Sequence, residues 1–139
     1  PQRRHRRHNR KAMRDNRQIT GRRGEDEACR YLRDRGHEII RRNWRCGHLE
    51  IDIISLDPEG LHIVEVKSRQ IPAPAAPQTN VDRRKMQKLT SAANAFLNSE
   101  ARGSLPSDLE VFFDVVTVLF DGPKFEIEYY PQAFIPLYA

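Results

Sequence analysis

The chain has 139 residues, of which 38% are hydrophobic and 31% are charged, and its formal net charge is +5. This length and composition suit one compact domain with a single core and are too small for two. No apolar run is long enough to span a membrane and no segment near the N-terminus resembles a secretion signal, so we expect a cytoplasmic protein.

The positive charge is concentrated at the N-terminus. Residues 1–19 contain eight Lys and Arg residues and one acid, Asp15, whereas the other 120 residues contain sixteen basic and eighteen acidic residues. Because this segment has almost no apolar side chains to bury, we expect residues 1–19 to form a flexible basic arm. Such an arm could attract nucleic-acid phosphates, or it could be a solvated tail with no dedicated partner.

The first ordered element is predicted to be a helix over residues 20–36, with Thr20 as its cap and Gly36 as its stop. Helical spacing places Glu25 on the same face as the apolar residues Ala28, Tyr31 and Leu32. Acids in a first helical turn also favour the helix dipole, which is the alternative explanation. An acid on an apolar face, beside Gly24, indicates that Glu25 could reach a neighbouring site.

The chain contains two cysteines, Cys29 and Cys46. They lack C-x-x-C spacing and a secretory context, so we expect free thiols. Cys46 and His48, with His37 nearby, do not supply the four regularly spaced ligands of a structural zinc site, and we do not predict one.

Residues 37–45 are predicted to form a strand that leads into a hairpin. The two arms of the hairpin, GHLEIDIIS (47–55) and LHIVEVKSR (61–69), show the period-two alternation that is typical of strands. Between them, residues 57–60 (DPEG) have the composition of a tight turn.

The register of this hairpin brings acids together. With a four-residue loop, facing residues have numbers that sum to 117, so Asp52 faces Glu65 and Glu50 faces Lys67. Like charges directly opposite on a sheet are destabilising, since paired side-chain carbons are only about 5 Å apart. Because the neighbouring residues on this face are apolar, the two acids must share a proton or a cation.

These residues predict a divalent metal site. Mg²⁺ takes oxygen ligands and commonly one or two carboxylates, which Asp52 and Glu65 could supply. Lys67, on the same face, could orient or activate a water, or stabilise charge on a phosphate. The alternative is that Glu50 and Lys67 form an ordinary cross-strand ion pair and that the acids belong to a structural network.

The second half of the chain begins with a loop. Residues 70–80 contain three prolines and no charge, so we expect a stiff, irregular loop that carries function or merely crosses over. Residues 81–103 are predicted to form a helix capped by Asp82, and its apolar face is core: Met86, Leu89, Ala93, Phe96 and Leu97. The basic residues at its start suit a solvated face or phosphate contact. We assign nucleic-acid binding to these basic residues and to one on the preceding strand: Arg84, Lys85, Lys88 and Arg69.

Two further strands are expected at 109–120 and 124–130, and the apolar tail at 131–139 should pack back on the sheet. Asp114 is a lone acid in an apolar strand; it is a satisfied core acid or a group that supports the site, and we prefer the former. The order α-β-β-β-α-β-β predicts an α/β sandwich around a mixed sheet.

Several of these motifs occur in the order seen in a known family. GRRGEDEA, LRDRGHEIIRRNWR, GHLEIDIIS, IVEVKSR and VDRRKMQKL resemble the YraN-like family of small uncharacterised bacterial proteins. Asp52 followed by Glu65-Val66-Lys67 also resembles the PD-(D/E)XK nuclease superfamily, and the YraN-like family is similar to archaeal Holliday-junction resolvases. The resemblance implies a restriction-endonuclease-like fold, a three-layer α/β/α sandwich, with a nuclease-like domain at residues 20–139.

The resemblance also implies roles for individual residues. Asp52, Glu65 and the carbonyl of Val66 would bind Mg²⁺ or Mn²⁺. Lys67 would position the attacking water, and Glu25 would match the first-helix acid of resolvase-like members. The reaction would be phosphodiester hydrolysis.

The substrate would be DNA, branched or damaged, and a two-fold dimer would suit a resolvase-like cut. The alternative is a non-catalytic nucleic-acid-binding module on the same scaffold. One departure concerns a later strand, where the family's R-F-D reads Phe112-Phe113-Asp114, which removes the basic residue at that position.

Overall fold

Two helices and five strands follow each other in the predicted order. The computed structural model of the protein describes residues 2–71 and 81–134. Its elements are α1 (Gln2–Asp34), β1 (Glu38–Cys46), β2 (Leu49–Asp57), β3 (Gly60–Gln70), α2 (Arg83–Leu97), the short 3-10 helix η1 (Glu100–Arg102), β4 (Val111–Asp121) and β5 (Lys124–Phe134).

The strands form one mixed sheet in the order β1-β2-β3-β4-β5. β3 and β4 run parallel, and the other three neighbouring pairs are antiparallel. A parallel pair needs a crossover connection, which the segment containing α2 provides between β3 and β4. β3 therefore lies at the centre of the sheet, with β2 on one side and β4 on the other.

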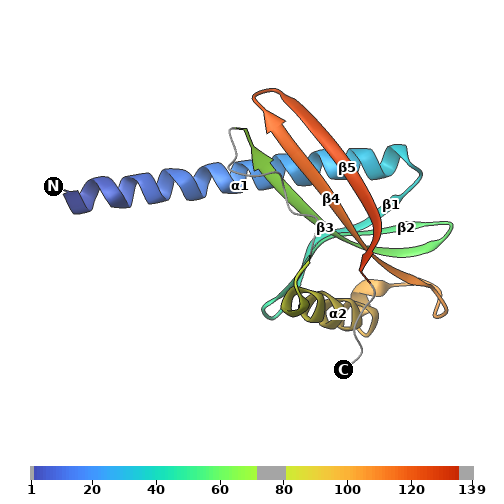
Figure 1. The fold of residues 1–139 in the computed structure, drawn as a ribbon. Helices are drawn as coiled ribbons and strands as arrows, with labels where there is room; N and C mark the ends of the chain where they lie inside the picture. Colours follow the sequence, from blue (N-terminus) through green and yellow to red (C-terminus); the bar gives the residue numbers. More distant parts are fainter. Residues whose placement is uncertain (1, 72–80, 135–139) are drawn as a thin grey trace.

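One helix covers each face of the sheet (Figure 1). Three buried apolar side chains of α1, Ala28, Cys29 and Leu32, pack with residues of β2, β3 and β4 in one core. On the other face, Leu89, Ala93 and Phe96 of α2 belong to a second core. The expected three-layer α/β/α sandwich is confirmed, and it is consistent with a restriction-endonuclease-like fold.

The prediction of an unstructured arm at residues 1–19 is wrong in its secondary structure. α1 begins at Gln2, so Thr20 is a buried residue inside the helix rather than its cap. No Gly or Pro interrupts residues 2–20, and Arg, Lys and Gln are good helix formers, so the turn that packs on the sheet propagates toward the N-terminus. Figure 1 shows this part of α1 (blue) extending beyond the sheet.

Both helices end near the predicted signals. α1 stops at Asp34, and Gly36 adopts the positive φ of 91° that a helix stop requires. Asp82 caps α2 as predicted, because its carboxylate accepts a hydrogen bond of 2.8 Å from the Lys85 amide. α2 ends earlier than predicted, at Leu97, and the remainder forms η1.

Other expectations concern the loop, the tail and the thiols. Residues 72–80 of the predicted loop and residues 135–139 of the tail lie outside the described part, while Phe134 is buried as expected. Both cysteines are free. Within residues 2–71 and 81–134, no helix combines the length and the apolar character needed to cross a bilayer.

Candidate functional site

The β2–β3 hairpin has the predicted register only near its turn. Facing residues sum to 117 from Asp57–Gly60 to Ile53–Val64, and the ladder stops there. The predicted pairs Asp52–Glu65 and Glu50–Lys67 are therefore not ladder partners. Instead, Oε1 of Glu50 lies 3.5 Å from a guanidinium nitrogen of Arg45 on β1.

β2 and β3 separate because the alternation of side chains between the two faces of the sheet is interrupted in β2 and, at the facing position, in β1. Ile53 packs on the α1 side of the sheet, whereas Ile51 packs on the α2 side, although residues two apart normally share a face. Asp52 lies between them, and on β1 Asn43, which lies between the partners of Ile51 and Ile53, has a positive φ of 50°. This local distortion turns β2 away and leaves one edge of β3 open beyond Val64.

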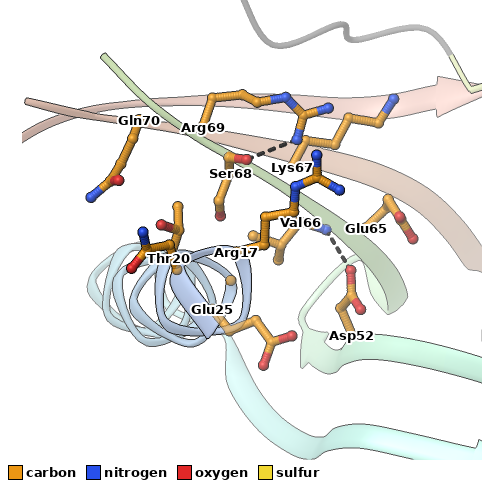
Figure 2. Close-up of a pocket in the computed structure, with 12 residues that line it drawn as sticks. Arg17, Thr20, Glu25, Asp52, Glu65, Val66, Lys67, Ser68, Arg69 and Gln70 are labelled. Carbon is orange, nitrogen blue, oxygen red and sulfur yellow. Dashed lines mark hydrogen bonds between the residues drawn. The ribbon is translucent and has the colours of Figure 1, made fainter. Parts of the chain in front are cut away.

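The open edge of β3 carries backbone groups that β2 would otherwise pair. The Val66 amide donates a hydrogen bond of 2.9 Å to Oδ2 of Asp52 (Figure 2). Because the N–H and C=O of one strand residue point to the same side, the Val66 carbonyl also faces this edge. This is the carbonyl that the family resemblance implies as a metal ligand.

A cleft of about 850 Å³ lies between α1 and the open edge of β3. Figure 2 shows its lining, in which Glu25 of α1 extends toward the side of the cleft where Asp52 of β2 meets the Val66 amide. The cleft collects all four predicted catalytic residues and the two other predicted residues of β3: Glu25, Asp52, Glu65, Lys67, Val66 and Arg69. On the α1 side, the cleft is also lined by residues 16, 17, 20 and 21, and none of these was predicted as a site residue.

The two central acids are hard to ionise. Burial and the neighbouring Glu65 carboxylate raise the pKa of Asp52 to about 7, although the Val66 amide opposes the shift. Burial also raises the pKa of Glu65, although Lys85 and Lys67 favour its charged form. The site thus holds more negative charge than its own hydrogen bonds satisfy, which is the condition in which a cation binds.

Lysine side chains provide the nearby positive charge. Nζ of Lys85 lies 3.4 Å from Oε1 of Glu65, so this predicted phosphate-binding residue contacts an acid of the site. Burial lowers the pKa of Lys67, and Arg69 and Lys85 lower it further, while Glu65 opposes the shift. Arg84 and Lys88 are exposed on α2 and are not among the described residues that line the cleft.

Glu25 is held at the edge of the site by β1. Its Oε2 accepts a hydrogen bond of 2.9 Å from Nδ2 of Asn43 and lies 3.9 Å from a guanidinium nitrogen of Arg42. Asn43 was not predicted to contribute, and no sequence pattern marks it, because its position depends on the local change of faces.

The donor atoms fit a hard divalent cation. Carboxylates and a backbone carbonyl form an all-oxygen set, which suits Mg²⁺ or Mn²⁺ better than the nitrogen and sulfur ligands that zinc prefers. Asp52, Glu65 and the Val66 carbonyl could hold such an ion, and Glu25 could hold one of its waters. The meeting of both acids with the open edge of β3 at Val66 in one cleft supports this fit, and the raised pKa values of Asp52 and Glu65 agree with it.

A second polar cluster, which the sequence analysis missed, lies at the turn end of the hairpin. His62 Nδ1 lies 2.5 Å from Oδ2 of Asp114, and its Nε2 lies 2.8 Å from Oδ1 of Asp57. Asp114 also accepts hydrogen bonds from the Tyr129 hydroxyl and the Gln132 amide, which confirms that it is a satisfied core acid.

His37 extends this second cluster. Its Nδ1 lies 2.9 Å from the Ser55 hydroxyl, and its Nε2 lies 3.5 Å from Asp57. One ligand atom each from His37, Asp57 and His62 lies within 4.8 Å of the others, a spacing that could hold a metal ion. Protein groups already satisfy both ring nitrogens of His62, so the cluster is explained as a buried hydrogen-bond network. The predicted hairpin register could have revealed this cluster, since facing residue numbers that sum to 117 pair His62 with Ser55.

Comparisons with known proteins match most of the chain. A sequence model of "Uncharacterised protein family UPF0102" matches residues 24–118. A UPF0102 protein of Bacteroides thetaiotaomicron is 37% identical over 116 residues, which cover 84% of this chain and 92% of that protein. UPF0102 proteins of Desulforamulus reducens and Nitratidesulfovibrio vulgaris are 37% and 38% identical, covering 84% and 88% of this chain and 96% and 88% of those proteins. The chain therefore belongs to family UPF0102, the YraN-like family of uncharacterised bacterial proteins.

Proposed function

We propose that this protein is a metal-dependent nuclease that hydrolyses phosphodiester bonds in DNA. The observation that carries the proposal is the crowding of Asp52 and Glu65, with raised pKa values, beside Lys67 in an open cleft. A purely structural acid pair gains nothing from such exposure to a cleft, whereas a metal-dependent hydrolase requires both the acids and the access.

Each residue has a role that follows from its position. Asp52, Glu65 and the Val66 carbonyl would hold Mg²⁺ or Mn²⁺, which would supply charge stabilisation at the phosphate and lower the pKa of a water. Lys67, whose pKa burial lowers, would orient the attacking water or neutralise developing charge. Glu25, fixed by Asn43, would position a further water at the α1 side of the cleft.

Cleavage assays on purified protein test this proposal. Four-way junction, flap, single-stranded and double-stranded DNA are incubated with Mn²⁺, Mg²⁺ or EDTA, and products are separated on denaturing gels. We expect metal-dependent cleavage that falls by about 100-fold or more in Asp52→Asn, which removes a ligand of the metal, and in Lys67→Ala, which removes the group that orients the water or neutralises developing charge.

The matched control is Glu59→Gln, which removes an exposed acid from the neighbouring turn and should leave the rate unchanged. Cleavage that persists at the wild-type rate in both site variants would come from a contaminant and would contradict the assigned site.

A second candidate function is a nucleic-acid-binding module without turnover. The contact between Lys85 and Glu65 favours it, because an ammonium group of the protein itself already offsets part of the negative charge. This function predicts salt-dependent DNA binding with no cleavage in Mn²⁺ or Mg²⁺. Lys85→Ala separates the two candidates: it should strengthen metal binding in a nuclease, whereas a binding module would only lose affinity for DNA.

A further inference from the structure

The part of α1 that extends beyond the sheet carries a line of arginines. Arg10, Arg14 and Arg17 follow each other at spacings of four and three residues, and all three side chains are exposed. At about 100° per residue, they occupy a sector of about 60° on one face of the helix. We call these three residues the arginine stripe.

The arginine stripe runs into the candidate site. The same four-and-three spacing continues through Gly21, Gly24 and Ala28, of which Gly24 and Ala28 are buried against the sheet. Arg17 itself lines the cleft together with Glu25, and Figure 2 shows its side chain reaching from α1 toward β3. One face of a single helix therefore packs on the sheet at one end and presents arginines beside the cleft at the other.

In the part of the chain that the structure describes, the arginine stripe forms no ion pair. None of the ion pairs among the described residues involves Arg10, Arg14 or Arg17. The one acid of this segment, Asp15, lies roughly 100° or more around the helix from each of them. Uncompensated arginines in a row form the electrostatic footprint of a phosphate-binding surface.

We propose that the arginine stripe binds the backbone of double-stranded DNA and leads it to the cleft. The role of the cleft as the place of cleavage rests on the proposed function above. The stripe rises about 10 Å along a straight helix, which corresponds to about three phosphates of one strand along the axis of B-DNA. A row of charges at the fixed spacing of a helix suits the regular backbone of a duplex better than a flexible single strand.

The stripe also lies outside the part of the chain that defines the family. The match to UPF0102 begins at residue 24, seven residues beyond Arg17. The strands that carry the acids lie within the matched residues, whereas the stripe lies before them, on a surface that the family match does not describe.

The test measures binding to a duplex of about 30 base pairs by fluorescence anisotropy, in EDTA so that no strand is cut. The stripe variant combines the substitutions Arg10→Gln, Arg14→Gln and Arg17→Gln. The matched control removes as many charges from another face of α1: Lys11→Gln, Arg22→Gln and Arg33→Gln, all exposed and roughly 110° around the helix from the stripe.

We expect the stripe variant to bind at least about 10-fold more weakly at low salt, and the slope of log K against log salt to fall by about 2 to 3. The control should lose no more than about threefold. Equal losses in the two variants, or none in the stripe variant, would overturn the proposal. A further variant, Arg10→Lys, Arg14→Lys and Arg17→Lys combined, keeps the charge and should retain most of the wild-type affinity, which separates charge from any effect on folding.

The wild type and the stripe variant also test two other binding partners, single-stranded DNA and anionic membranes. Tighter binding of a single strand than of the duplex would overturn the choice of double-stranded DNA. Binding of vesicles with anionic lipids that the stripe variant loses, with duplex binding unchanged, would assign the stripe to a membrane surface and overturn the proposal. If the wild type binds the duplex through the stripe but does not cut it with Mn²⁺, only the proposed nuclease function fails.

Discussion

The two polar regions along the β2–β3 hairpin use similar side chains with opposite outcomes. At the turn end, His62 lies between Asp57 and Asp114, and each of these groups has hydrogen-bond partners from the protein. At the other end, Asp52 and Glu65 lie in a cleft with raised pKa values. The first region is closed and satisfied, and the second is open and holds excess negative charge.

This difference shows that a structural network is distinguished from a candidate site by whether its polar groups have hydrogen-bond partners, and not by how deeply they are buried. The Asp114 carboxylate is buried, yet its oxygens accept hydrogen bonds from a hydroxyl and an amide and lie beside an imidazole. Asp52 has one recorded hydrogen bond among the described residues and faces a second carboxylate. Removing an acid should therefore destabilise the protein in the first region and stabilise it in the second.

The largest effect is expected from Asp114→Asn. This change removes the carboxylate beside Nδ1 of the buried His62 and should lower the free energy of unfolding by about 3–5 kcal/mol. Urea denaturation followed by circular dichroism measures it. Asp121→Asn, at an exposed acid of the same strand, is the control and should change stability by no more than about 0.5 kcal/mol. A loss below 1 kcal/mol for Asp114→Asn would contradict the structural role of the network.

Asp52→Asn should raise the free energy of unfolding rather than lower it. Because the pKa of Asp52 is raised to about 7 in the folded protein, the folded state disfavours the carboxylate, and stability falls as the pH rises from about 4 to 7. The variant should therefore be more stable at pH 8 by about 1–3 kcal/mol and equal to the wild type near pH 4. Denaturation at the two pH values checks this, and a variant that is less stable at pH 8 would show that Asp52 serves the fold rather than a site.

Gly24 tests how closely α1 must approach the cleft. A Cβ at this position would lie 1.7 Å from the Ser68 hydroxyl oxygen and 2.9 Å from its Cβ, so Gly24→Ala should cost about 1–3 kcal/mol. Gly21→Ala is the matched control on the same helix face, since nothing lies within 4 Å of its Cβ, and it should stabilise α1 by about 0.5–1 kcal/mol. Thermal melts of both variants would show opposite shifts, and equal shifts would mean that α1 does not lie against β3 in this way.

The smallest effect concerns pH and His62. Burial lowers the pKa of His62, but hydrogen bonds to Asp114 and Asp57 outweigh this and raise it overall. The stabilisation from the protonated ring is therefore fully present below its unfolded pKa of about 6.5 and is lost as the pH rises through the raised folded value.

We expect the wild type to lose about 1 kcal/mol relative to His62→Gln between pH 6 and pH 9, measured by urea denaturation. The comparison within one pH series removes the contribution of Asp52, which both proteins share. Parallel stability curves for the two proteins would show that the pKa of His62 is the same in the folded and unfolded states, which contradicts its raised folded value.

Local patterns predicted the elements that depend on neighbouring residues. The two strands β2 and β3, the turn at 57–60 and the cap at Asp82 were all correct, because near neighbours in the chain determine them, whereas the alternation along β2 holds only from Ile53 to the turn. The family motifs added the likeness to the YraN-like proteins. The extension of α1 was missed, since the propagation of a helix depends on the packing of its C-terminal half on the sheet.

The sequence by itself determined the two acids on one hairpin, the lysine beside them and the mixed α/β architecture, since strand periodicity and the order of the elements specify all three. Only the tertiary structure decided that β2 turns away at Asp52, that Lys85 of α2 meets Glu65, and that Arg17 of α1 reaches the cleft. These contacts join residues from three elements, and their positions follow from how the two helices pack on opposite faces of the sheet, which no short stretch of the chain encodes.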